Sequence, residues 1–344
     1  MLDMAVNWPS VVGLAVVSLP CILLNSVVIA GILLDRSLHS VTNIFIVSLA
    51  TADLLVGSVV VPLYVAEQNS GSVGVLLDCI LMRSFTVFFI MASVAHLLLI
   101  TVDRFIAITF PLRYQTLMTK RRAIAFIVAC WVLSIMAAFA PFMGWRREDS
   151  RDLRQVSGIC GYLDYMTLPY IVTMFIVWYA IPVVVMVVLY GLIFRTASKQ
   201  ANRIRDINRN AEHLNKQEDT ANGALRSGQS RTPSTVDHRK AEKVLCAIFG
   251  CFFACTLPGL IFLFIDHVTG SEVSITLANF TNILTFLNSA LNPLLYGIGN
   301  RQVRGSIRER FQRVARAVSS PCLLCGPSDQ QSTGTEMTVS VTDA

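Results

Sequence analysis

Residues 79–105 have the sequence CILMRSFTVFFIMASVAHLLLITVDRF, an apolar run that ends in Asp103-Arg104-Phe105. A helix needs about 20 apolar residues to cross the hydrocarbon core of a bilayer, which is roughly 30 Å thick. Only helices and closed barrels satisfy their backbone hydrogen bonds in lipid, and a run of this length is typical of a helix. We therefore expect residues 79–102 to form a membrane-spanning helix.

Similar apolar blocks occur along the rest of the chain, separated mostly by short polar stretches. The chain has 344 residues, of which 54% are hydrophobic and 15% are charged, against roughly 25% charged in a soluble domain. A large soluble helical core would show polar faces at helical spacing, which most of these blocks lack. The sequence predicts an all-α fold, an integral membrane bundle of seven transmembrane helices. The other six blocks are 11–34, 42–66, 123–145, 166–194, 243–267 and 273–298.

The positions of lysine and arginine predict the orientation of this bundle, because positive charge collects in cytoplasmic loops. If the N-terminus lies outside, most of the 28 Lys and Arg residues fall on the cytoplasmic side. We therefore expect an outside N-terminus and a cytoplasmic C-terminus. The net charge of +6 then belongs to a face next to anionic membrane lipid, and no nucleic-acid site is expected. The basic residues left outside are Arg83, Arg146, Arg147, Arg151 and Arg154.

The segments around the bundle, 11–298, differ from it in composition. Residues 1–10 form a short extracellular N-terminus without Lys or Arg, so no cleavable signal peptide is predicted. The third inside loop, about 196–240, is polar with almost no apolar pattern and is predicted to be mostly disordered.

Beyond the bundle, the sequence predicts an amphipathic helix on the membrane surface over 299–318, followed by a disordered cytoplasmic tail over 319–344. The tail is rich in Ser and Thr. The helix is predicted from apolar residues that recur among basic ones at helical spacing, namely Val303, Ile307, Phe311 and Val314.

The nine cysteines fall into three groups. Five lie within the spans, where they are small apolar packing residues, and Cys322 and Cys325 lie in the cytoplasmic tail. Only Cys79 and Cys160 lie on the outside, where a disulfide is stable. We therefore predict a disulfide between them.

Several polar residues lie at membrane depth, where they are costly and usually functional. Asp53 is central in the second span, Asn25 in the first and Ser93 in the third. We predict that they form one polar cluster with three residues of the seventh span, Asn288, Ser289 and Asn292.

Prolines inside the later spans predict kinks close to polar residues. Pro293 removes a backbone donor next to Asn292, and Pro182 and Pro258 do the same in spans five and six. Kinked helices of this kind are candidate hinges of a two-state bundle.

Together these residues resemble the rhodopsin-like family of G-protein-coupled receptors over all seven spans. The matching residues are Asn25, Leu49–Asp53, Cys79 with Cys160, Asp103-Arg104-Phe105, Trp131, Pro182 with Tyr190, Phe252 with Pro258, and Asn292-Pro293-Leu294-Leu295-Tyr296.

The resemblance implies a plasma-membrane receptor, not an enzyme, that transmits an extracellular small-molecule signal to a heterotrimeric G protein. Asp103 would restrain Arg104 at rest, and Arg104 would meet the G protein once span six, kinked at Pro258, swings outward. Leu112 would insert into the G protein. Two tyrosines would stabilise the open state together with the kink at Asn292-Pro293, namely Tyr190 and Tyr296.

The resemblance also implies an allosteric sodium ion, with no other cofactor. Sodium would favour the resting state. Cys322 or Cys325 resembles a palmitoylation site, and the Ser/Thr-rich tail is a candidate for arrestin binding. The sodium site would consist of Asp53, Ser93, Asn288, Ser289 and Asn292.

The chain departs from the family pattern at three positions. Thr256 stands where most members carry a ligand-sensing Trp, and His238 where many carry the Glu that pairs with the Arg of span three. We expect raised ligand-independent signalling from both changes. Thr86 stands where amine receptors carry Asp, so a simple cationic amine would lack its partner. Residues 273–298 contain no Lys, which excludes a retinal Schiff base.

The predicted ligand pocket opens to the outside and has mostly apolar walls. Such a lining favours a small, uncharged or weakly polar ligand. The lining residues are Thr86, Phe89, Met174, Thr256, Leu260, Leu263, Asn282 and Phe286.

Among subfamilies, the chain resembles adenosine receptors through Pro111-Leu112-Arg113-Tyr114 and Pro141-Phe142-Met143-Gly144-Trp145. Leu263 and Phe286, however, replace that subfamily's polar purine contacts. Two alternatives remain open from the sequence. One is a constitutively active or ligand-independent receptor-derived protein, and the other is an ion transporter or channel that uses the Asp53 cluster.

Overall fold

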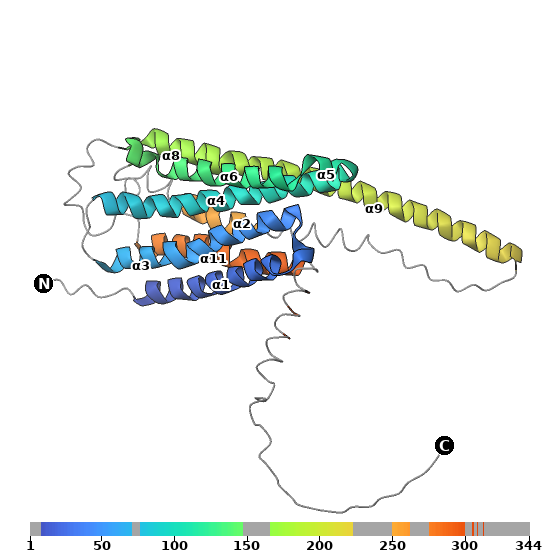
Figure 1. Ribbon diagram of the computed structural model, residues 1–344, viewed down its shortest axis with the longest axis horizontal. Coiled ribbons are helices and arrows are strands. Elements are labelled where there is room, and N and C mark those ends of the chain that lie inside the picture. Colours follow the sequence, from blue (N-terminus) through green and yellow to red (C-terminus); the bar gives the residue numbers. More distant parts are fainter. Residues whose placement is uncertain are drawn as a thin grey trace, which may run out of the picture. The chain divides into compact units, whose positions relative to one another are not determined.

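The computed structural model describes residues 8–70, 76–146, 166–222, 250–261 and 275–299, with the single positions 305, 308 and 312. Every regular element within these residues is a helix (Figure 1), and one isolated bridge joins Arg146 to Met166. The prediction of an all-α membrane bundle is confirmed. The main helices are α1 (Trp8–Leu33), α2 (Val41–Leu55), α4 (Leu76–Thr109), α6 (Lys120–Ala138), α9 (Ile181–Asn222) and α11 (Ile275–Gly299).

Five helical segments of the described residues are long and apolar enough to cross a membrane. They match the first five predicted blocks. The sixth block is represented by the shorter apolar helix Gly250–Ile261, and the seventh by α11. The five segments are Val11–Leu33, Val41–Ala66, Ile80–Thr109, Lys120–Ala138 and Leu168–Ala211.

One π-helical turn, η2 (Val56–Val60), joins α2 to α3 (Val61–Ser70) within the second span. Gly57 lies in this turn, and a Cβ added there would lie 3.1 Å from the Cβ of Cys21 on α1. The glycine therefore allows the first two spans to approach closely.

The fifth span contains a second π turn. α8 (Leu168–Phe175) leads through η6 (Ile176–Ala180) into α9, just before Pro182. Such turns mark functional sites more often than chance, and this one places Tyr179 against the helix Gly250–Ile261.

The connections at 34–40, 110–119 and 139–144 contain short helical turns, and capping residues set where several helices begin. The hydroxyl of Thr119 accepts a hydrogen bond from the backbone N–H of Arg122 at 3.4 Å, which satisfies one of the free donors at the start of α6. The turns are η1 (Arg36–Leu38), η3 (Pro111–Arg113), α5 (Tyr114–Leu117) and η4 (Ala140–Met143).

Two predicted boundaries are wrong. The fourth span ends at Ala138 rather than near residue 145, because Pro141 and the left-handed Gly144 (φ 103°) form a turn there. The third inside loop, predicted from residue 196, instead begins as a helix, because α9 continues to Asn222. Gln200 ties this extension to α4 by donating to the carbonyl of Ile108 at 3.2 Å.

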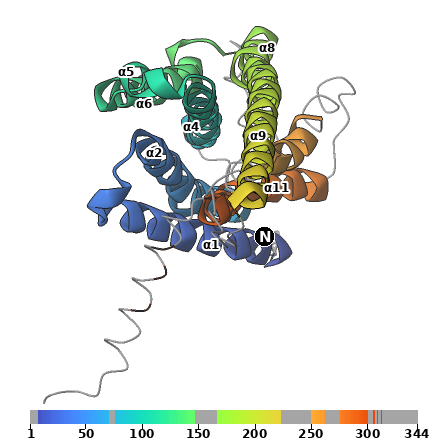
Figure 2. The same cartoon turned by 90° about the vertical axis from the view of Figure 1, so that its right-hand side faces the viewer.

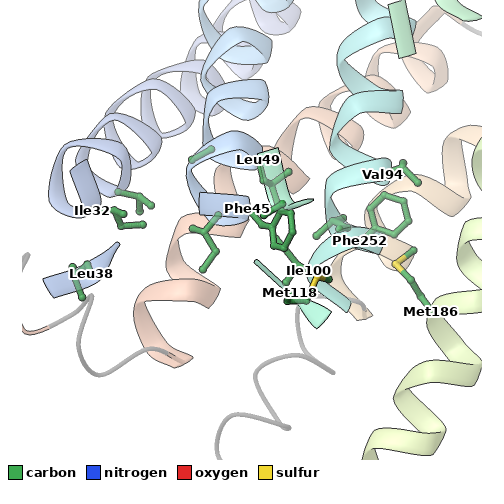
Figure 3. Packing of buried hydrophobic residues seen from close by; sticks show 14 residues of the cluster. Ile32, Leu38, Phe45, Leu49, Val94, Ile100, Met118, Met186 and Phe252 are labelled. Carbon is green, nitrogen blue, oxygen red and sulfur yellow. The ribbon is translucent and has the colours of Figure 1, made fainter. Parts of the chain in front are cut away.

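The helices pack around two hydrophobic clusters. α1 contacts α2 and α11, and α4 contacts α2, α6 and α9, as the view along the helices shows (Figure 2). One cluster lies at the end of the bundle near Asp103, here called the Asp103 end, and includes Phe45, Ile100 and Phe252 (Figure 3). The other lies toward the opposite end, here called the Tyr64 end, and includes Phe89 and Phe286.

Polarity in this bundle is reversed relative to a soluble protein. Asp53 and Asn292 are fully buried, whereas Val16 on α1 is 64% exposed. Exposed aliphatic side chains suit contact with lipid tails, and buried polar groups satisfy one another between helices. Other exposed apolar residues lie on α1, α6 and α9, among them Leu19, Leu23, Val128, Met136, Val184 and Val188.

Residues 305, 308 and 312 are helical, and the rest of the predicted surface helix at 299–318 lies outside the described residues beyond Gly299. The tail 319–344, with Cys322 and Cys325, lies outside them as well.

Candidate functional site

The Asp53 carboxylate joins three helices in the middle of the bundle. It lies on α2 and is fully buried. Ser93 on α4 donates to its Oδ1 at 3.2 Å, and Asn292 on α11 donates to its Oδ2 at 2.8 Å. Hydrogen bonds to a charged group contribute about 1.5–3 kcal/mol each. The cluster predicted from sequence is therefore present for these three residues.

α1 joins the same cluster through Asn25 and Cys21. The Asn25 amide donates to the carbonyl of Cys21 at 2.8 Å and to the carbonyl of Ser289 on α11 at 3.1 Å. The Cys21 thiol donates to the backbone carbonyl of Asp53 at 3.0 Å. Cys21 is thus a polar contact as well as the packing residue expected from sequence.

Three amide oxygens at this depth are buried and have no hydrogen-bond partner among the described residues, on Asn25, Asn288 and Asn292. A buried acceptor without a partner costs about 1–3 kcal/mol. Amide and carboxylate oxygens are the ligands that hard cations prefer. Because Asp53 supplies one negative charge, this donor set fits a monovalent cation such as sodium.

At the Asp103 end, the buried Asp103 carboxylate holds α2, α4 and the following turn together. Thr42 on α2 donates to its Oδ2 at 2.6 Å, and Tyr114 on α5 donates to its Oδ1 at 2.7 Å. The Nε of Arg104 lies 3.9 Å from Oδ2. The neighbouring arginine therefore makes only one of several contacts that stabilise this carboxylate.

Tyr114 keeps its proton in this arrangement. Burial, and then the hydrogen bond to Asp103, raises the pKa of Tyr114 to about 12. The phenol therefore remains a donor to Asp103 throughout the physiological pH range.

Two residues predicted to meet a G protein are accessible at the same end. The Arg104 side chain is 34% exposed, and Leu112, in the turn η3, is 96% exposed. Both side chains are therefore accessible at this end of the bundle. Tyr190 on α9 accepts a hydrogen bond from Thr101 on α4 at 3.2 Å.

Thr256 is held by a tyrosine from span five. Its hydroxyl donates to the carbonyl of Phe252 at 2.8 Å and lies 3.3 Å from the hydroxyl of Tyr179. Since the one Thr256 proton is directed at Phe252, Tyr179 is the donor between the two spans. The Tyr179 ring also lies 6.1 Å from the ring of Phe252. Tyr179 therefore packs against the helix Gly250–Ile261 beside Thr256.

The predicted pocket residues gather toward the Tyr64 end. Phe89 and Phe286 are buried in one cluster, and Met174 packs against it. Thr86 is half-buried, and its hydroxyl donates to the carbonyl of Met82 at 3.1 Å. Leu260 is half-buried on the helix Gly250–Ile261.

The structure adds residues here that sequence reasoning missed. Tyr64 on α3 donates to Asn279 at 2.9 Å and accepts from Asn282 at 2.7 Å, both on α11. The guanidinium carbon of Arg83 lies 5.5 Å from the centre of the Tyr64 ring. Three polar side chains and one arginine thus lie beside the apolar pocket residues.

His96 is a second feature that was missed. Its Nε2 lies 2.8 Å from the hydroxyl of Ser48, which accepts from the indole of Trp131 at 3.0 Å. The three side chains connect α2, α4 and α6. Because each is bonded, we read this network as a structural one.

Some predicted residues cannot be placed. Cys160, His238 and Leu263 lie outside the described residues. Cys79 and Tyr296 lie on described helices, but their side chains are outside the described set. The disulfide, the lipidated cysteines and the role of His238 remain predictions.

Comparison with known proteins identifies the family. The family of "7 transmembrane receptor (rhodopsin family)" matches residues 24–296. The chain belongs to the rhodopsin family of seven-transmembrane receptors. It is a multi-pass membrane protein of the G-protein-coupled receptor class, as the resemblance implied.

Similar receptors come from an insect and from mammals. The chain is 32% identical to the octopamine receptor beta-2R of Chilo suppressalis, covering 86% of this chain and 77% of the relative. It is 33% identical to the human 5-hydroxytryptamine receptor 4, covering 85% and 76%. It is 31% identical to the histamine H2 receptor of Cavia porcellus, covering 83% and 75%.

The expected adenosine-like subfamily is not supported, because these relatives are receptors for octopamine, 5-hydroxytryptamine and histamine. The motifs behind that expectation lie at the turns η3 (Pro111–Arg113) and η4 (Ala140–Met143). Proline presets the backbone of such turns, so these motifs set the shape of helix ends.

Thr42→Val should destabilise the receptor, because the buried Asp103 carboxylate loses a hydrogen bond at 2.6 Å. We expect a loss of about 1.5–3 kcal/mol, measured as a lower melting temperature of the purified receptor. Thr51→Val is the matched control, since the Thr51 hydroxyl bonds only its own helix in the described structure, at the carbonyl of Val47. Equal melting temperatures for the two variants would contradict this role of Thr42.

Proposed function

We propose that this receptor binds a small molecule at the Tyr64 end, from outside the cell, and engages a G protein at the Asp103 end. The observation that carries the proposal is the Asp53 cluster, which bonds α2, α4 and α11 to one another between the two ends. A rearrangement of α11 against α4 must change these bonds, so both ends can bias the same equilibrium.

Thr86 supports a ligand other than a simple cationic amine. The resemblance implies Asp at this position in amine receptors, where it pairs with the ammonium group. The Thr86 hydroxyl is neutral and is directed at the carbonyl of Met82. A buried ammonium group without an anionic partner is costly. We therefore propose that this receptor shares the fold of its amine-receptor relatives but binds a different class of ligand.

We also propose that sodium bound at Asp53 opposes activation. The residues that would hold it are Asp53, Ser93, Asn288, Ser289 and Asn292, with the buried oxygen of Asn25 as an added candidate. A bound sodium ion supplies positive charge at the carboxylate. Ser93 and Asn292 hold α4 and α11 in one arrangement around the Asp53 carboxylate on α2. A sodium ion that bound only to this arrangement would favour it over the others.

Asp53→Asn should abolish the effect of sodium on signalling. Receptor reconstituted with G protein should exchange nucleotide more slowly in sodium chloride than in potassium chloride, and the variant should exchange equally in both. Ser93→Ala should weaken the difference, because Ser93 donates to Asp53. Ser134→Ala, another buried serine on α6, is the matched control and should behave like the wild type. Undiminished sodium sensitivity in Asp53→Asn would rule out this site.

The hydrogen bond between Tyr179 and Thr256 is proposed to restrain span six at rest. The contact between Asp103 and Arg104 is present at 3.9 Å, which is the resting arrangement that the resemblance implies. Where most family members carry a Trp at position 256, this receptor has only the contact between the Tyr179 and Thr256 hydroxyls at 3.3 Å. This substitution supports the expectation of raised ligand-independent signalling.

Tyr179→Phe should raise ligand-independent signalling further, because the two spans lose a hydrogen bond while the ring remains. A neutral hydrogen bond contributes about 0.5–1.5 kcal/mol, which corresponds to roughly a 2- to 13-fold change in the population of the active state. The measurement is ligand-free nucleotide exchange by reconstituted G protein. Tyr170→Phe, which loses a hydroxyl contact to the carbonyl of Ala137 on α6, is the control. Unchanged exchange in Tyr179→Phe would remove this restraint from the account.

A further inference from the structure

The start of α6, at the Asp103 end of the bundle, carries three consecutive basic residues, here called the basic turn. They are Lys120, Arg121 and Arg122, and all three are exposed. Cations in the first turn of a helix oppose the helix dipole. The helix itself therefore gains nothing from these charges, which points to a partner outside it.

The chain around the basic turn supplies no negative charge to neutralise it. Residues 104–147 contain neither Asp nor Glu. Asp103, just before this range, is fully buried and accepts hydrogen bonds from Thr42 and Tyr114. Within the part of the chain that the structure describes, no ion pair joins the basic turn to a carboxylate. Its positive charge is therefore available to an anion.

Arg122 fixes the basic turn against the preceding connection. Its Nη1 donates to the carbonyls of Thr116 and Leu117, the last two residues of α5, both at 3.0 Å. Basic side chains suit the carbonyls at a helix C-terminus. Because these contacts engage Arg122, the exposed cations that remain are Lys120 and Arg121, held at a defined place.

Arg121 lies at one end of a row of apolar residues on α6, here called the apolar stripe. Its members are between 47% and 53% exposed, and their spacing of three or four residues places them on one face of the helix. Ala123 and Ser134 are fully buried and mark a different side. The helix lies at the rim of the bundle (Figure 2). The apolar stripe comprises Ile124, Val128, Val132 and Ile135.

The length of the apolar stripe matches that of a lipid chain. From Arg121 to Ile135 the helix rises about 21 Å, whereas one leaflet of the hydrocarbon core is roughly 15 Å deep. The basic turn therefore lies near the membrane surface when the apolar stripe lies in hydrocarbon. A lipid that lies along α6 would contact the apolar stripe with its acyl chains and bring its head group to Lys120 and Arg121.

The two exposed cations favour a head group that carries phosphate monoesters. The guanidinium of arginine binds phosphate oxygens in pairs, and lysine supplies a compact charge. A phosphate monoester carries more than one negative charge and three acceptor oxygens. Phosphatidylserine is anionic as well, but its ammonium group would meet a like charge here. A phosphoinositide head group has no cation.

We propose that Lys120 and Arg121 bind the head group of a phosphoinositide whose acyl chains pack along the apolar stripe. Arg122 is a positioning residue that holds the connection beside this site. The sequence places this end of the bundle in the cytoplasm, so the lipid belongs to the inner leaflet. This inference goes beyond the proposed function, because the site faces lipid and involves neither the ligand pocket nor the G protein.

The test is a competition between two anionic lipids for the purified full-length receptor in detergent. Phosphatidylinositol bisphosphate and phosphatidylserine are added in equal amounts, and native mass spectrometry measures which lipid stays bound. We expect the phosphoinositide to predominate. In Lys120→Gln/Arg121→Gln it should fall roughly tenfold or more, because two cations near the membrane surface are lost. Arg203→Gln/Arg205→Gln, which removes the same charge from exposed positions of α9, is the matched control and should match the wild type.

Equal retention of the two lipids, or equal losses in the two double variants, would overturn the proposal, since either result indicates general attraction between charges. An undiminished amount of bound phosphoinositide in Lys120→Gln/Arg121→Gln would overturn it as well. Inositol trisphosphate, the water-soluble head group, tests the contribution of the apolar stripe. We expect it to displace the lipid only in large excess, and displacement at equal concentration would contradict a lipid site.

Discussion

The structure depends on the burial of one carboxylate, Asp53, in the middle of an apolar bundle. Taking an ionised carboxylate out of water costs several kcal/mol even after relaxation. Partners on other helices must offset that cost, and α4 and α11 supply them through Ser93 and Asn292. On α1, the Cys21 thiol donates a hydrogen bond to the backbone carbonyl of Asp53. The Asp53 side chain thus joins α2, α4 and α11, and α1 is bonded to the backbone of the same residue.

The same principle organises both ends of the bundle. Asp103 is buried and satisfied by Thr42 and Tyr114, so the adjacent Arg104 remains partly exposed. At the Tyr64 end the buried charge is positive and lies over an aromatic ring. The exposed aliphatic residues that surround these groups favour lipid and contribute little to the order of the helices. Buried polar contacts therefore specify the arrangement, and they lie where a receptor must change shape.

Sequence reasoning found the spans and the Asp53 cluster, because long apolar runs and rare polar residues within them are visible without coordinates. It misplaced the end of the fourth span, because Pro141 and Gly144 form a turn there. It also misplaced the start of the third inside loop, because helix-forming residues after Arg195 continue α9. It missed the contact between Tyr64 and Asn279, which are separated by 215 residues. Arg83 was counted among the basic residues on the outside of the membrane, and the sequence did not show that neighbouring helices bury its side chain.

The central claim is that Asp53 and Asn292 act as a coupled pair that joins α2 to α11. A double-mutant cycle of Asp53→Ala and Asn292→Ala, measured by the unfolding of the purified receptor, tests it directly. The account predicts a coupling energy of about 1–3 kcal/mol, because each single change removes the same hydrogen bond. Effects that add to within about 0.5 kcal/mol would show that the two residues are independent and would contradict the account.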